Sequence, residues 1–134
     1  VLYAKEVSVQ LIPNGNAPSH YMKSLDSPSV TVLFREDDDA DIGMVRVDIP
    51  PGAGMPQHRH NGSDVILTPV AGAVRVIKEG AATDVQVGDV LLILKDEIVE
   101  LTNPHDDPAE ITVTTTLPHL SWSPVPSTPV QSDL

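Results

Sequence analysis

The chain has 134 residues, of which 40% are hydrophobic, a formal net charge of −11 at pH 7, and no cysteine. This length suits one domain with a sizeable core. The lack of cysteine excludes disulfides, iron–sulfur clusters and thiolate zinc sites. The acidic charge argues against nucleic-acid or anionic-membrane partners. Neither a cleavable signal pattern nor an apolar run near the roughly 20 residues that span a bilayer is present, so we expect a soluble, cytoplasmic protein.

Short stretches of alternating apolar residues, separated by turn residues, indicate an all-β domain. The chain has 13 prolines, 8 glycines and no long segment with the helical period. In chain order we predict an edge strand within 1–12, an irregular connection over 16–29, strands at 30–35 and 43–49, and a solvated hairpin tip in the acidic run 36–41. Further strands are predicted at 65–68, 73–78, 83–87, 90–94, 98–102 and 111–117. Such short, evenly spaced strands are typical of a β-sandwich or a jelly-roll barrel.

Three regions are distinguished along the chain. Residues 1–29 hold the edge strand and its connection, residues 30–117 the barrel, and residues 118–134 an extended tail. The tail is rich in proline, which cannot donate a hydrogen bond to a sheet, and we expect Leu120 and Trp122 to pack on the domain or on a partner subunit. Open sheet edges near the N-terminus and this tail suggest a homodimer.

Two histidines in the middle of the chain are the leading candidates for chemistry. His58 and His60 are separated only by Arg59, so an extended strand places both imidazoles on one face and the arginine on the other. Inside a small barrel that face lines the interior. Neutral imidazole is a ligand for Zn, Cu, Fe and Ni, so an inward pair of this kind is half of a metal site. Asp64 could add a carboxylate, or it could be a residue of the turn 61–64.

The stretch around these histidines resembles the first motif of the cupin family. That motif has a glycine, five residues, His-x-His, three or four residues, a glutamate, and later a glycine. The matching positions here, with aspartate in place of glutamate, are Gly52, His58, His60, Asp64 and Gly72.

A later stretch resembles the second cupin motif, although three of its positions differ. Gly88 and Asn103 match its two ends, while Leu94, Asp96 and Val99 replace the family's proline, glycine and histidine. The resemblance covers residues 42–116 and implies an all-β jelly-roll β-barrel, also called a double-stranded β-helix. It also implies a small-molecule substrate and a homodimer, since dimers are common in the family.

The resemblance implies a divalent transition metal (Fe, Mn, Ni or Zn) held by His58, His60 and Asp64. An inward Val99 cannot act as a ligand, so the usual three-histidine, one-carboxylate centre would be incomplete. Two histidines and one carboxylate suit non-haem Fe(II) and O₂ chemistry or Lewis-acid catalysis. A metal-dependent dioxygenase, isomerase or lyase is therefore the first hypothesis.

Other side chains could replace the missing ligand, and other functions remain open. Glu97 shares the face of Val99 if the strand extends that far, whereas Glu100 points outward and His105 and His119 lie beyond strand ends. One alternative is a metal-free cyclase or epimerase in which His58 or His60 is a general base. The other is a non-catalytic module that binds a small molecule.

The remainder of the barrel interior is expected to be apolar. An inward arginine would bind a substrate carboxylate through two hydrogen bonds, and we consider Arg46 or Arg75 for that role. The apolar candidates, some of which must face outward, are Val45, Val47, Ile66, Val74, Val76, Leu92 and Ile93.

Overall fold

The computed structural model describes residues 10–13, 19–22, 27–34, 40–116 and 122–125. Every regular element in those residues is a β-strand, which confirms the all-β prediction, and none of them forms a helix that could cross a membrane. The strands are β1 (Ser19–Met22), β2 (Ser29–Phe34), β3 (Ile42–Ile49), β4 (Gly54–His60), β5 (Val65–Ala71), β6 (Ala73–Lys78), β7 (Ala81–Gln86), β8 (Leu91–Ile93), β9 (Val99–Thr102), β10 (Ala109–Thr116) and β11 (Trp122–Pro124).

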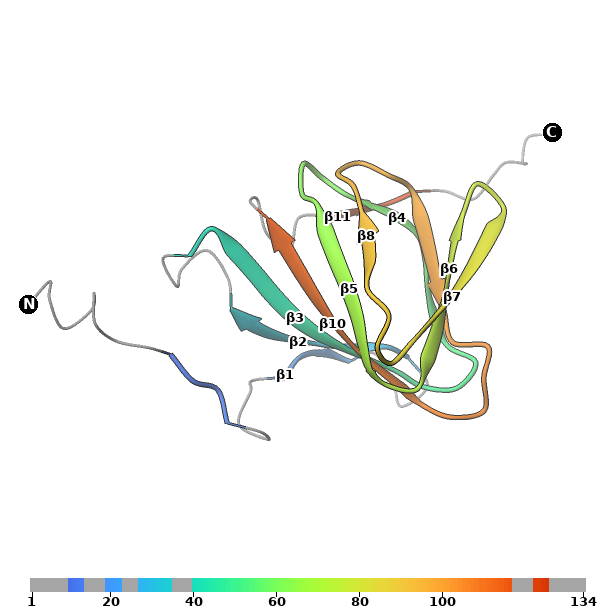
Figure 1. Cartoon of the computed structure of the whole chain (residues 1–134), viewed down its shortest axis with the longest axis horizontal. Coiled ribbons are helices and arrows are strands. Elements are labelled where there is room, and N and C mark those ends of the chain that lie inside the picture. The colour runs from blue at the N-terminus through green and yellow to red at the C-terminus, as the bar shows by residue number, and fades with distance from the viewer. Residues whose placement is uncertain (1–9, 14–18, 23–26, 35–39, 117–121, 126–134) are drawn as a thin grey trace, which may run out of the picture.

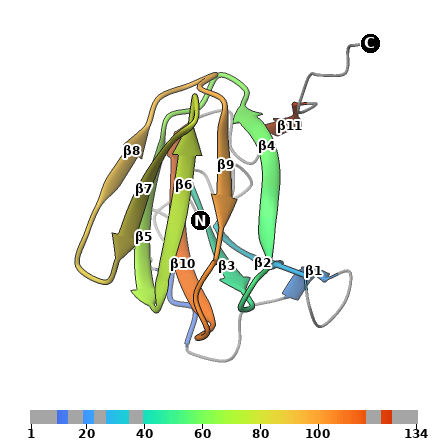
Figure 2. The same cartoon turned by 90° about the vertical axis from the view of Figure 1, so that its right-hand side faces the viewer.

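The strands form two antiparallel sheets that face each other across one core (Figure 1). One sheet has the order β1-β2-β3-β10-β5-β8, and the other has the order β11-β4-β9-β6-β7. Figure 2 shows β6 and β9 of the second sheet in front of β3 and β10 of the first. Strands that follow one another in the chain often lie in different sheets, which is the winding of a jelly roll.

Alternating side chains build the core between the sheets. In β3 and in β10 every second residue is buried, and the two strands pair in unbroken register from Ile42–Thr116 to Ile49–Ala109. The period of two in each strand therefore directs one apolar row into the molecule and one polar row out. The most deeply buried apolar side chains are Ile49, Val65, Val74 and Ile111.

The strand predictions are confirmed to within a few residues at each end, with two additions that the sequence did not reveal. β1 pairs with β2 inside the stretch 16–29 that we expected to be irregular, and β11 pairs with β4 inside the proline-rich tail. Both pairings occupy the outer edges of sheets, where unpaired backbone groups accept a further strand without needing an apolar pattern. The edge strand expected within 1–12 is not present at 10–12, and its residues 1–9 lie outside the described part of the chain.

A turn and a buried amide set the direction in which β4 enters the barrel. The Ala53 amide donates to the Pro50 carbonyl at 3.1 Å, and Gly52 at the third turn position has φ +78°, which is the conformation of a type II turn with proline before glycine. Asn103, which is fully buried, binds this turn through its backbone and donates from Nδ2 to the carbonyls of Ile49 (3.0 Å) and Asp107 (2.8 Å). The asparagine that ends the second motif therefore has a structural role.

Candidate active site

A bulge in β4 determines how the histidines are presented. The pairing of β4 with β9 is regular at Met55 and again at His58, and its register shifts between them. Bulges insert an extra residue and re-aim the following side chains, and they are places where a strand tolerates proline, here Pro56. As a result Met55 and His58 both face the barrel interior although they are an odd number of residues apart.

His58 is held in one orientation by this bulge. Its Nδ1 donates to the Pro56 carbonyl at 2.8 Å, so Nδ1 carries the proton and the lone pair of the neutral ring lies on Nε2. The side chain is buried at 5% exposure. Burial lowers the pKa of His58, while the bond to Pro56 opposes that change.

His60 lies beside His58 on the same face, as the i, i+2 spacing predicted. The two ring centroids are 4.9 Å apart and the planes are nearly perpendicular, at 85°. Burial, and then the neighbouring His58, lower the pKa of His60 from 6.5 to about 4, so both rings are neutral near pH 7. The Nδ1 atom of His60 is buried and has no hydrogen-bond partner.

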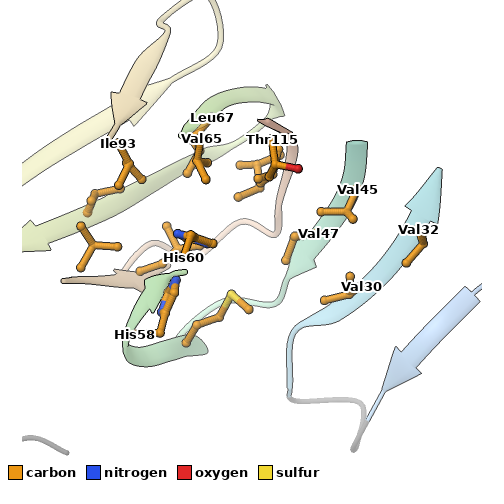
Figure 3. A pocket seen from close by; sticks show the side chains of 16 residues that line it. Val30, Val32, Val45, Val47, His58, His60, Val65, Leu67, Ile93 and Thr115 are labelled. Atoms are coloured by element: carbon orange, nitrogen blue, oxygen red, sulfur yellow. The ribbon is translucent and has the colours of Figure 1, made fainter. Parts of the chain in front are cut away.

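Both rings face a cavity of about 250 Å³ between the two sheets (Figure 3). Three lining residues have polar side chains: His58, His60 and Thr115. The other thirteen are apolar, namely Val30, Val32, Val45, Val47, Met55, Val65, Leu67, Val76, Ile93, Val99, Leu101, Ile111 and Val113. The expectation of an apolar interior is thus met, although Ile66 and Leu92 of the expected set face outward and are exposed, and Val74 is buried outside the cavity lining.

Thr115 is a site residue that sequence reasoning missed. It is the fourth inward position of β10, after Ala109, Ile111 and Val113, and only 4% of it is exposed. The signal was present in the alternation of that strand, because a polar residue occupied a position in the apolar row. Its hydroxyl oxygen is buried without a partner.

Asp64 is not brought to the histidines, which corrects the predicted third ligand. Its Oδ1 accepts the Lys95 amide at 2.9 Å, and its own amide donates to Thr116 Oγ1 at 3.0 Å. These bonds join the loop after β4 to the loop after β8 and to the end of β10, and Asp64 does not line the cavity. Within the described part of the chain, no cluster of three His, Cys, Asp or Glu side chains could hold a metal ion.

Val99 points into the cavity and lies directly opposite His58 in the β4–β9 register. Glu97, the leading replacement for a ligand at this position, faces solvent instead. It forms an ion pair with Lys78 and accepts the Leu94 amide at 2.6 Å, and these partners lower its pKa. The cavity lining also lacks Glu100 and His105, as it lacks Glu97. His119 is outside the described residues.

The arginines considered for binding a substrate carboxylate also point away from the cavity. Arg46 Nε lies 2.9 Å from Glu110 Oε2, and Arg75 Nε lies 2.7 Å from Asp84 Oδ1. The outward direction of both arginines follows from the alternation of side chains along a strand, because the neighbours of Arg46 and Arg75 in their strands are inward valines. The cavity lining therefore contains no charged side chain.

Comparison with known proteins identifies the architecture. A family model described as a cupin domain matches residues 45–115, a little over half of the chain. No curated protein sequence matches the chain.

Several solved structures share the fold. The polyketide cyclase RemF from Streptomyces resistomycificus is similar with a TM-score of 0.74 and 13% identity, covering 88% of this chain and 86% of that one. An uncharacterized conserved protein with a double-stranded β-helix domain from Klebsiella pneumoniae has a TM-score of 0.66 and 16% identity, with coverage of 76% and 87%. Recombinant oxalate oxidase in complex with glycolate has a TM-score of 0.69 and 20% identity over 81% of this chain and 60% of that one. These similarities confirm the jelly-roll, double-stranded β-helix fold.

Proposed function

This chain belongs to the cupin family, and from that premise we propose that it is a small enzyme that binds an organic molecule inside the barrel. In this proposal His58 and His60 form the reactive end of the cavity and hold a divalent transition metal ion, one of Fe, Mn, Ni or Zn. The observation that carries the proposal is the placement of two neutral imidazoles side by side in an otherwise apolar cavity.

The two imidazoles suit a metal ion in their chemistry. Histidines that bind metals commonly donate their second ring N–H to a carbonyl, which fixes the ring and the tautomer, and His58 makes this bond to Pro56. The lowered pKa of His60 keeps its ring neutral well below pH 7, so one ring nitrogen has the lone pair that a metal ligand needs. Because the described residues supply no third ligand, the ion would be held weakly and would keep open positions.

Each part of the site has a role in this proposal. The apolar walls would exclude water and hold the substrate by shape, His58 would stay oriented by Pro56, and His60 would present the unpartnered side of its ring to the cavity. A bound ion would act as a Lewis acid or as a centre for O₂ chemistry. Dioxygenase, isomerase and lyase reactions all fit this arrangement.

A second candidate is a metal-free cyclase or epimerase in which one histidine is a general base. The absence of a third ligand among the described residues favours it, and a neutral imidazole in an apolar site can accept a proton from a substrate. His58 is the better candidate base, because its bond to Pro56 leaves one defined nitrogen to accept that proton.

Metal content tests the first candidate directly. The full chain is purified after growth with Fe, Mn, Ni and Zn supplied, and is then measured by atomic mass spectrometry and titrated with each ion. We expect about one ion per chain at saturation, no binding by His60→Ala, and unchanged binding by His105→Ala, an exposed histidine that serves as the matched control. Less than about 0.1 equivalent of every ion in the wild type would contradict metal dependence.

Chelation separates the remaining possibilities. Turnover that survives complete metal removal but is lost in His58→Ala would support the metal-free base. Ligand binding that is unaffected by both His58→Ala and His60→Ala, without turnover, would instead indicate a non-catalytic binding module. Each variant is first checked for folding by far-UV circular dichroism.

A further inference from the structure

The hydroxyl of Thr115 is a buried polar group that nothing in the described part of the protein satisfies. The residue is 4% exposed, lines the cavity, and its Oγ1 has no hydrogen-bond partner. Burying a hydroxyl without a partner costs on the order of 1–3 kcal/mol. Valine has nearly the same shape without that cost, so the hydroxyl needs an explanation.

The neighbours of Thr115 in the sheet explain why the hydroxyl has no partner. In the registers of β10, Thr115 lies opposite Gly43 of β3 on one side and Val65 of β5 on the other. Gly43 has no side chain and the Val65 side chain has no polar atom, so neither neighbouring side chain can bind the hydroxyl. Figure 3 shows Thr115 on a different wall of the cavity from His58 and His60.

The charge of the cavity limits the kind of molecule that it can bind. The lining contains no Asp, Glu, Lys or Arg side chain. The outward arginines Arg46 and Arg75 already pair with Glu110 and Asp84. A carboxylate transferred from water into this cavity would lose its hydration without gaining an opposite charge from the protein, which costs several kcal/mol.

We propose that the cavity selects a neutral, largely apolar ligand with one hydroxyl or carbonyl group, and that Thr115 is the specificity-determining residue that hydrogen-bonds this group. A volume of about 250 Å³ suits a ligand of the size of a bicyclic aromatic. The inference rests on the proposed function only in taking the barrel cavity as the ligand site. The exclusion of a carboxylate applies to the metal-free cavity, because a bound divalent ion would supply the opposite charge.

Matched probes test the inference on the full chain after metal removal by chelation. The probes are 2-naphthalenemethanol, which is neutral, and 2-naphthoate, which replaces the alcohol with a carboxylate on the same ring system. Binding is followed by calorimetric titration and by amide chemical-shift changes. Thr115→Val removes the hydroxyl at nearly constant shape, and Thr114→Val makes the same change on the adjacent, outward-facing residue of β10.

We expect the alcohol to bind, with shift changes at cavity residues, and the naphthoate to bind at least about tenfold more weakly because its charge is unpaired. Thr115→Val should weaken binding of the alcohol by about fivefold to tenfold, the worth of one hydrogen bond, while Thr114→Val should leave it unchanged. The inference is overturned if naphthoate binds as tightly as the alcohol, if Thr115→Val has no effect, or if neither probe binds. Because the probe titration is made on the metal-free chain, its result stands even if the protein does not bind metal in the test of the proposed function.

Discussion

The buried histidine pair should make the metal-free protein lose stability at mildly acidic pH. His60 has a pKa of about 4 in the folded chain against 6.5 in the unfolded chain, so between these values the unfolded state binds a proton that the folded state does not. Stability is therefore full above pH 6.5, falls as the pH drops toward 4, and levels off below it. Since one pKa unit corresponds to about 1.4 kcal/mol, the lowering of the His60 pKa from 6.5 to about 4 accounts for at most about 3 to 4 kcal/mol, and for less to the extent that its ring meets water.

The assay is urea unfolding of the chelated full chain at intervals from pH 7.5 to pH 4.5, for the wild type and for His60→Gln. The carboxylates with shifted pKa values, Asp84 and Glu97, titrate below this range because their partners lower their pKa. We expect the free energy of unfolding of the wild type to fall more steeply with acidification than that of His60→Gln, whereas His105→Gln should follow the wild type. Parallel curves for the wild type and His60→Gln would show that His60 ionises freely in the folded protein, and the description of a desolvated site would be wrong.

Three further predictions concern the ligand shell, the scaffold and the assembly. Val99→His should tighten metal binding by about tenfold, because residue 99 lies directly opposite His58 and a third imidazole completes a common ligand set. The control Glu100→His, on the other face of the strand, should leave the metal affinity unchanged. Equal metal affinities of Val99→His and the wild type in a titration would contradict a third ligand at this position. Asn103→Ala should cost about 3 kcal/mol in urea unfolding, because it removes the hydrogen bonds to the Ile49 carbonyl before the turn into β4 and to the Asp107 carbonyl of the loop before β10. A loss below about 1 kcal/mol would argue against that role. We also expect a homodimer, since among the described strands each sheet ends in an edge strand with no further partner. A monomer mass by light scattering at micromolar concentration would refute this.

What the sequence alone could determine follows from the local periodicity of strands. Side chains alternate with a period of two, so the spacing of His58 and His60 placed both rings on one face, and the same alternation turned Arg59 away. The spacing of apolar stretches and turn residues indicated the all-β barrel. The sequence left the direction of Val99 open, and the structure places it in the cavity lining.

Only the tertiary structure decided which groups meet across the barrel, because those contacts join residues far apart in the chain. The loop after β4 directs Asp64 to the Lys95 amide and not to the histidines, and a loop conformation depends on the partners that surround it. The recruitment of β1 and β11 to sheet edges likewise depends on free backbone groups that leave no side-chain pattern. The sequence also could not show that the Thr115 hydroxyl lacks a partner, because this depends on Gly43 and Val65 lying on either side of it in the sheet. A register between distant strands is set by the packing of the whole core.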